Sequence, residues 1–321
     1  MRKNPTCNLC GRRCGVPRSG PRARAGYCGA LELVGVSQAL LHHGEEPPLS
    51  GSPPGGSGTI FFTRCNLSCV FCQNHAISQT PGAGEDVTAE DLAAVMLELQ
   101  KMGAYNINLV SPTPYAAQIA LAVFKAKNDG LSIPVVYNTG GYDSPEALDL
   151  MEGLIDVYLP DVKLGYQEPL RPGGADRRSE KLFGVPDYPA VNRRAVERML
   201  KQTGHLRVGP DGLAVRGLIL RHLVLPDNLA RTDGVLKWIR EDLGKETCLS
   251  LMAQYHPANK VETGYSPEFS AYPGLSRPLS VREYDMWVEK AWALGLENTF
   301  VQDLEAAGTY LPDFSKPGVF S

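Results

Sequence analysis

The chain has 321 residues, of which 43% are hydrophobic and 21% charged, a composition typical of a globular protein with a large core. The net charge of −3 and the lack of a basic stripe argue against nucleic acid as the main partner. No run of 18 apolar residues occurs, and the basic segment 1–24 lacks the apolar stretch of a signal peptide, so we expect no membrane span. Eight cysteines in such a chain indicate metal or redox work in the reducing cytoplasm.

Residues 1–30 form a cysteine-rich N-terminal extension. Its four cysteines follow C-x2-C-x3-C-x13-C spacing and have glycines beside them: Cys7, Cys10, Cys14 and Cys28. So short a segment cannot build its own apolar core, so we expect a metal to hold it. Four thiolates without oxygen ligands suit either structural zinc or a second iron–sulfur cluster. The alternative, four reduced cysteines without a metal, is disfavoured by the tight spacing.

Residues 31–57 are predicted to be a linker. The stretch 50–58 is rich in Gly, Ser and Pro, which favours a flexible lead into the first strand over a loop that cradles a ligand. Polar residues gather just before it, at 42–47. They either contact a substrate or form a solvated turn, and the sequence slightly favours the turn.

Strands and helices alternate from residue 58 onward. We expect strands at 58–62, 106–110, 133–137, 155–159, 218–225, 249–255 and 299–302, and helices at 89–102, 116–128, 192–203, 232–243, 281–294 and from 145. Helix starts are marked at Thr88, at Ser144 and at Ser280. Such alternation implies parallel strands with right-handed crossovers. We therefore predict an α/β fold, a partial (β/α)6 barrel over residues 58–305, followed by a C-terminal tail at 306–321.

Three cysteines, Cys65, Cys69 and Cys72, follow the first strand at C-x3-C-x2-C spacing. Cysteine thiolates usually hold all four irons of a cubane cluster, so a loop with three thiols leaves one iron open. A chemical mechanism needs an open iron, whereas an electron carrier does not. The alternative is zinc with a fourth ligand from elsewhere, but only Cys69 and Cys72 form the C-x2-C pair that zinc sites favour. A disulfide is disfavoured because nothing marks the chain as secreted.

Polar residues stand where the predicted strands end, which is where barrel enzymes place their active sites. They are Gln73, Asn74, Ser111, Thr113, Asn138, Thr139, Asp161, Lys163, Arg221, His222, Gln254 and His256. Arg221 lies in an apolar strand, where a charge is costly unless it is paired, so we expect a ligand carboxylate beside it. Asp161 and Lys163 could instead be a simple ion pair at the rim. We expect His222 to be a packing residue and Cys248 to be a buried structural thiol.

The cysteine loop, with the aromatic Phe71 before its third cysteine, resembles the signature of the radical S-adenosylmethionine (SAM) superfamily. Residues 55–305 resemble the activating enzymes of glycyl radical enzymes, and more closely the pyruvate formate-lyase activating enzyme-like proteins. The segments that carry this resemblance are 59–62, 69–74, 158–163, 221–226 and 254–257, together with 7–15 in the N-terminal extension.

The resemblance implies that Cys65, Cys69 and Cys72 bind a [4Fe–4S] cluster whose open iron takes the amino and carboxylate groups of SAM. It implies SAM contacts for Asp161, Lys163, Arg221 and His256, and places Phe71 near the adenine. Asn74 and Asn138 are further candidates because they stand at strand ends. Where the superfamily often has Gly-Gly-Glu to hold the SAM amino group, this chain has Ser-Pro-Thr at 111–113, so Ser111 or Thr113 would serve.

Together these features predict a radical SAM oxidoreductase. It would cleave SAM reductively to methionine and a 5′-deoxyadenosyl radical, which would abstract hydrogen from a substrate. A one-electron donor, flavodoxin or ferredoxin, is implied. The substrate is either a backbone glycine of a glycyl radical enzyme, or a small molecule or another peptide site. The alternative class is a non-catalytic iron–sulfur or zinc binding protein. The N-terminal extension either passes electrons to the main cluster or docks a partner, and no catalytic residue is assigned.

Overall fold

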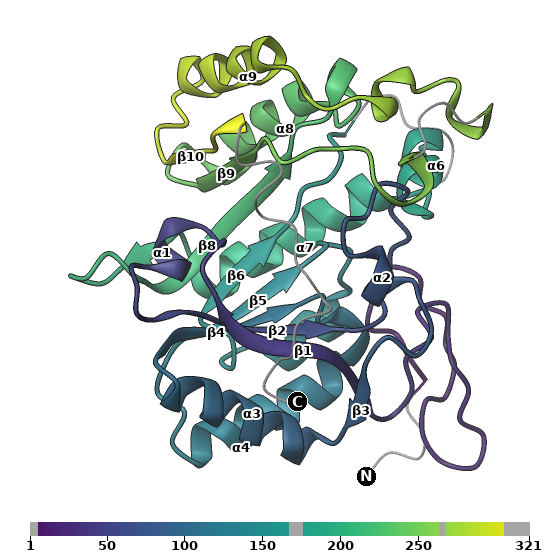
Figure 1. Ribbon diagram of the computed structural model, residues 1–321, viewed down its shortest axis with the longest axis vertical. Helices are drawn as coiled ribbons and strands as arrows, with labels where there is room; N and C mark the ends of the chain where they lie inside the picture. The colour runs from purple at the N-terminus through teal and green to yellow at the C-terminus, as the bar shows by residue number, and fades with distance from the viewer. Residues whose placement is uncertain (1–5, 167–175, 263–266, 305–321) are drawn as a thin grey trace.

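The computed structural model describes residues 6–166, 176–262 and 267–304 (Figure 1). In these ranges ten strands form one sheet: β1 (Val34–His42), β2 (Gly56–Phe62), β3 (Glu85–Val87), β4 (Ala104–Val110), β5 (Val135–Thr139), β6 (Val157–Pro160), β7 (Arg207–Val208), β8 (Ala214–Leu223), β9 (Cys248–Met252) and β10 (Thr299–Val301). The order across the sheet is β10-β9-β8-β6-β5-β4-β2-β1-β3, and β7 pairs with β8. The predicted tail at 306–321 lies outside the described residues.

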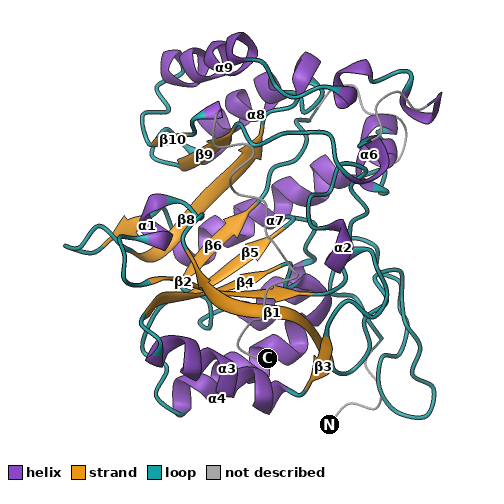
Figure 2. Ribbon diagram, in the orientation of Figure 1, coloured by secondary structure: helices purple, strands orange, loops and turns teal. Residues whose placement is uncertain are grey.

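The helices of these ranges are α1 (Pro47–Ser50), α2 (His75–Ser78), α3 (Ala89–Lys101), α4 (Ala116–Asn128), α5 (Pro145–Met151), α6 (Arg177–Phe183), α7 (Tyr188–Thr203), α8 (Thr232–Trp238) and α9 (Val281–Ala293). Most of the helices, among them the long α3, α4, α7 and α9, lie along the outside of the curved sheet (Figure 2). The strands β2, β4, β5, β6, β8 and β9 pair in parallel. The predicted α/β fold with a partial (β/α)6 barrel is therefore confirmed.

The helix starts that the sequence marks are present. Thr88 Oγ1 accepts a hydrogen bond from the backbone N–H of Asp91, and the Asp91 carboxylate accepts one from the N–H of Thr88 (each 3.1 Å). Ser280 and Glu283 form the same reciprocal cap at the start of α9. Ser144 accepts from the N–H of Ala147 at 3.1 Å. Such caps form within one turn, which is why local sequence predicts them.

The predicted linker, 31–57, is instead a part of the barrel sheet. Its strand β1 pairs antiparallel with β2 on one side and with β3 on the other. Val34, Val36 and Ala39 of this strand are buried in the main apolar core. The physical reason is that β2 would otherwise be an exposed edge of the parallel sheet, and β1 covers that edge. No helix in the described ranges is both long and apolar enough to cross a membrane.

Candidate active site

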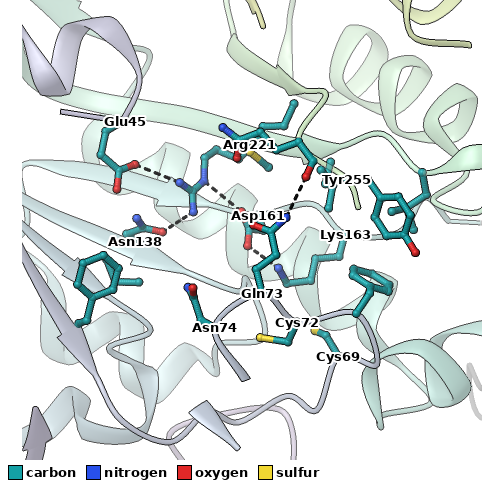
Figure 3. Close-up of a pocket in the computed structure, with 18 of the residues that line it drawn as sticks. Glu45, Cys69, Cys72, Gln73, Asn74, Asn138, Asp161, Lys163, Arg221 and Tyr255 are labelled. Atoms are coloured by element: carbon teal, nitrogen blue, oxygen red, sulfur yellow. Dashed lines mark hydrogen bonds and ion pairs between the residues drawn. The ribbon is translucent and has the colours of Figure 1, made fainter. Parts of the chain in front are cut away.

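An open cavity of about 220 Å³ lies at the carboxyl ends of the parallel strands (Figure 3). Predicted site residues from several segments line it: Cys69, Phe71, Cys72, Asn74, Asn138, Asp161, Lys163 and Arg221. The cysteine loop follows β2, Asn138 lies in β5, Asp161 follows β6, and Arg221 lies in β8. The barrel topology thus brings together residues that are far apart in the chain.

The cysteine loop is held at the end of β2 by backbone hydrogen bonds to α6. The N–H of Ser68 donates to the carbonyl of Phe183 at 3.1 Å, and that of Val70 donates to Leu182 at 3.0 Å. The N–H of Leu67 points back at the Cys65 sulfur at 3.4 Å. This last contact is of the kind that stabilises a thiolate, because hydrogen bonds to sulfur tune iron–sulfur sites.

The three thiols of the loop are close enough to affect one another electrostatically. Burial raises the pKa of Cys65 to about 11, opposed by the N–H of Leu67 and by the charge of Lys163. Burial also raises the pKa of Cys69, and the Lys163 charge is the largest opposing influence. A metal that binds these sulfurs would therefore displace their protons in a site where Lys163 already favours negative charge.

The arrangement of the three thiols in the cysteine loop helps to decide between zinc and a four-iron cluster. Among the described residues, no three His, Cys, Asp or Glu side chains are arranged to hold a metal ion as they stand. A single-ion zinc site at the cysteine loop therefore has no support here. A four-iron cluster makes a different demand, because each thiolate binds a different iron and the sulfurs stand apart. Three thiols on one loop beside an open cavity fit that group.

Arg221 is the centre of a buried polar array on the cavity wall. Its Nε donates to Asp161 Oδ1 at 3.1 Å, and its Nη1 donates to Glu45 Oε2 at 3.2 Å. Its Nη2 donates to Asn138 Oδ1 at 2.7 Å. The expected pairing of this charge with a carboxylate is present, but the protein itself supplies two carboxylates. The sequence did not indicate these two protein carboxylates, and the expected ligand carboxylate beside Arg221 stays a prediction.

Glu45 is a site residue that the sequence did not single out. It belongs to the polar segment 42–47, for which the sequence favoured a solvated turn, yet its side chain is only 8% exposed. Its Oε1 accepts from Asn108 Nδ2 at 2.9 Å. The turn is buried because it follows β1, whose pairing with β2 brings the turn to the cavity wall. There the distant Arg221 compensates the charge of Glu45. Figure 3 shows Glu45 and Asp161 on either side of the Arg221 guanidinium.

The charges of this array reinforce one another. Burial alone would raise the pKa of Asp161, but the nearby Lys163 and Arg221 outweigh it and hold the pKa below its usual value. Lys163 Nζ donates to Asp161 Oδ2 at 2.5 Å. Three of the five N–H groups of Arg221 are used by protein acceptors, so two remain for a ligand. Lys163 likewise keeps donors beyond its bond to Asp161, so the wall can bind an anionic group.

Asn74 and Phe71 face the same cavity. Asn74 Oδ1 is buried without a hydrogen-bond partner, which is costly unless a ligand donor meets it. Phe71 is 8% exposed and packs edge-to-face on Phe183 and Tyr255, with centroids 5.9 and 5.6 Å apart. An orphaned acceptor and a fixed aromatic ring beside the thiols are features that a bound organic cofactor would satisfy.

Three residues predicted to contact SAM lie outside the cavity lining. Thr113 is 1% exposed, and its hydroxyl donates to Asp143 Oδ1 at 2.7 Å, in a buried network that the sequence did not indicate. Thr113 is therefore occupied structurally instead of facing a ligand amino group. Ser111 adopts a positive φ of 61° and donates its N–H to the Asn138 carbonyl at 2.8 Å. His256 Nδ1 lies 3.2 Å from Nε2 of Gln73, which lines the cavity.

The structure confirms a structural role for two residues that the sequence predicted to be structural. His222 is fully buried, with Nδ1 2.6 Å from the Val162 carbonyl and Nε2 2.9 Å from Thr232 Oγ1. Both ring nitrogens are thus satisfied, and the prediction of a packing residue is confirmed. Cys248 begins β9 and is 4% exposed, which confirms the prediction of a buried thiol.

The thiols of the N-terminal extension are close enough to raise one another's pKa. The pKa of Cys10 is raised to about 12 by burial, and its sulfur accepts the N–H of Arg12. Cys28 Sγ accepts from Arg18 Nη2 at 3.1 Å. These contacts describe a compact thiol cluster, and zinc or a second iron–sulfur cluster there stays a prediction.

Comparison with known proteins places the chain in a family. Residues 59–203 match the family model described as the radical SAM superfamily. An uncharacterized protein of Methanocaldococcus jannaschii, MJ0674, is 30% identical over 301 residues, which cover 91% of this chain and 75% of that protein. A second one from the same organism, MJ0808, is 24% identical over 327 residues, which cover 96% and 84%. The protein belongs to the radical SAM superfamily, as the cysteine loop predicts.

Solved structures that match part of the chain include native anSMEcpe with bound AdoMet and a Cp18Cys peptide, at TM-score 0.45 and 12% identity. The match covers 72% of this chain and 56% of that chain. Native anSMEcpe with bound AdoMet alone matches at TM-score 0.43 and 12% identity, covering 72% and 57%. The chain thus spans a little over half the length of these solved chains.

Proposed function

We propose that the protein is a radical SAM oxidoreductase that cleaves SAM reductively at a [4Fe–4S] cluster and abstracts hydrogen from a substrate. The observation that carries this proposal is the opening of the three-cysteine loop onto a cavity walled by Arg221, Asp161 and Lys163. When bound, the cluster and SAM supply the electron transfer and the carbon–sulfur cleavage that give methionine and a 5′-deoxyadenosyl radical.

The residues of this chain would divide the binding of SAM as follows. Cys65, Cys69 and Cys72 hold the cluster and leave one iron open. The free N–H groups of Arg221 and Lys163 bind the carboxylate, and Asp161 fixes both cations in place. With Thr113 engaged elsewhere, Asn74 Oδ1 is our candidate acceptor for the SAM amino group, because it is buried in the cavity wall without a partner.

Apolar side chains complete the cavity and support radical chemistry. Phe61, Leu223, Leu225 and Met252 line it beside the polar array. Once SAM and substrate fill the cavity, this lining would exclude water, which strengthens the electrostatic contacts and protects a reactive intermediate. We assign no proton-transferring residue, and the proposed work of the protein is to position SAM and substrate.

For the substrate we propose a backbone glycine of a glycyl radical enzyme, on the strength of the sequence motifs shared with activating enzymes. A small molecule or another peptide site is the alternative. A one-electron donor such as flavodoxin or ferredoxin would supply the electron, in the cytoplasm. Incubation with candidate glycyl radical enzymes, followed by EPR for a glycyl radical, tests the finer proposal. Failure of every candidate to gain a radical would leave the alternative substrates.

SAM cleavage tests the general proposal independently of the substrate. The protein would be reconstituted with iron and sulfide without oxygen, reduced with dithionite and assayed for 5′-deoxyadenosine by liquid chromatography. We expect product from the wild type and from Cys248→Ala, a change at a buried thiol outside the loop, and none from Cys69→Ala. A fully loaded wild type that forms no product, with or without candidate substrates, would contradict the proposal.

A further inference from the structure

The N-terminal extension carries a concentration of positive charge. Residues 6–31 include five arginines and no lysine or acidic residue, although the whole chain has a net charge of −3. Arg13 is neutralised by Glu146 through two hydrogen bonds of 2.9 Å. The remaining four arginines are without a carboxylate partner among the described residues: Arg12, Arg18, Arg22 and Arg24.

The contacts of these arginines leave their charges uncompensated. Arg12 donates to the backbone carbonyls of Asn66, at 2.6 Å, and Gly184, at 3.0 Å. Arg18 donates to the carbonyl of Pro114 and to the Cys28 sulfur. Arg22 and Arg24 are exposed. Neutral acceptors satisfy hydrogen bonds but do not cancel charge, so the four guanidinium groups create a positive potential on this face.

This charged segment is fixed against the cysteine loop. The bond from Arg12 to Asn66 joins the extension to the residue directly after Cys65. The Tyr27 hydroxyl donates to Ser68 Oγ at 2.9 Å, and the Arg12 guanidinium stacks on the Tyr27 ring at 3.3 Å. Cys28 is near enough to Cys65 to influence its pKa. In Figure 1 the extension forms the purple loops beside α2 and β3.

We propose that the N-terminal extension is the docking surface for an acidic protein that donates one electron to the cluster. This inference rests on the proposed function, because it requires a cluster at Cys65, Cys69 and Cys72. In the step itself, one electron leaves the reduced flavin or iron–sulfur centre of the donor and enters the cluster. The donor is oxidised by one electron, the cluster is reduced by one, and no bond forms or breaks.

The electrostatics favour this role over a structural one for the exposed arginines. Arg22 and Arg24 are exposed and make no ion pair with any described residue. A cluster of uncompensated charge accelerates association with a partner of opposite charge, and salt weakens the effect. The bonds through Arg12 and Tyr27 would place the docked donor against the loop that holds the metal.

The test uses the full-length reconstituted protein, with an acidic flavodoxin as the donor and dithionite as the small-molecule control. Its variant reverses two exposed charges, Arg22→Glu with Arg24→Glu, and its matched control is Arg282→Glu, an exposed arginine in the first turn of α9. Flavodoxin affinity is measured by calorimetry at low and high salt, and 5′-deoxyadenosine formation is measured with each reductant.

We expect the double variant to bind flavodoxin at least roughly tenfold more weakly at low salt and to lose most of the salt dependence. Flavodoxin-driven cleavage should fall in parallel, while dithionite-driven cleavage and the Arg282→Glu protein stay unchanged. Unaltered flavodoxin affinity, or equal losses with flavodoxin and dithionite, would overturn the proposal. If the fully loaded wild type forms no 5′-deoxyadenosine with dithionite, with or without candidate substrates, the proposed function fails. The binding measurement still decides whether the extension docks an acidic protein.

Discussion

Arg221 Nη1 lies 3.2 Å from Glu45 Oε2, although 176 residues separate the two in the sequence. Arg221 comes from β8 and Glu45 from the turn that follows β1, so the contact ties the segment after the antiparallel strand β1 to a parallel strand of the barrel. Because of this pairing, the segment before β2 is part of the cavity wall and can influence whatever the cavity binds.

Removal of Glu45 should destabilise the fold measurably. In Glu45→Ala, a buried guanidinium keeps Asp161 but loses its second carboxylate, so we expect the free energy of unfolding to fall by about 3 kcal/mol. Glu45→Gln retains an acceptor and should lose less. Chemical denaturation of the metal-free protein measures this, with Glu289→Ala, at an exposed position in α9, as the control. A Glu45→Ala protein as stable as the control would contradict the importance of the pair.

Arg221→Lys should weaken SAM binding while the protein stays folded. Lysine keeps the charge but cannot reproduce the guanidinium fork that reaches Asp161, Glu45 and Asn138 together. We expect the SAM dissociation constant to rise roughly tenfold or more, as for the loss of one charged hydrogen bond. Calorimetry under anaerobic conditions measures it. Arg216→Lys on the same strand, whose Nη2 bonds the Gln202 carbonyl, is the control and should bind SAM normally.

Gly184→Ala should disturb the cysteine loop by displacing Ser68. Gly184 ends α6 with φ 72°, and a Cβ there would meet Ser68 Oγ at 2.1 Å. Gly295 after α9 has a similar φ of 75° but open space around it, so Gly295→Ala should cost only the left-handed strain of about 1–2 kcal/mol. We expect a larger loss of stability and a lower iron content after reconstitution in Gly184→Ala. Equal stability and iron content in the two variants would show that the loop tolerates the clash.

The pH dependence of stability should report the burial of His222. Burial lowers the pKa of this residue to about 4, whereas an unfolded histidine titrates near pH 6.5. Between these values the unfolded chain binds a proton that the folded protein excludes, so the free energy of unfolding decreases as the pH falls. The decrease attributable to this group amounts to roughly 3 kcal/mol by about pH 4. Denaturation curves should show it in the wild type and not in His222→Gln; parallel pH profiles would contradict it.

The features that the sequence predicted are those set by local chemistry. The caps at Thr88 and Ser280 form within one helical turn, and the strand–helix alternation follows from apolar periodicity. The cysteine spacing identifies its own loop because all three thiols lie within eight residues. Strand ends differed by a few residues, as in β8, which begins at Ala214 instead of 218.

The features that the sequence missed depend on partners that are distant in the chain. Glycines and prolines at 51–56 suggested a linker, whereas β1 just before them is fixed by pairing with β2 and β3. Glu45 looked like a solvated residue because Arg221 lies 176 positions away. Thr113 looked like a ligand contact because nothing local shows that Asp143 captures its hydroxyl.

The central claim is that three thiols hold a cluster with one iron open to SAM beside Arg221. The most direct measurement is the EPR spectrum of the reduced, reconstituted protein before and after SAM is added. We expect a cluster signal that SAM shifts in the wild type, shifts more weakly in Arg221→Lys, and that is lost in Cys69→Ala. A fully loaded wild-type cluster whose signal SAM leaves unchanged would contradict the account, because SAM then has no open iron to bind.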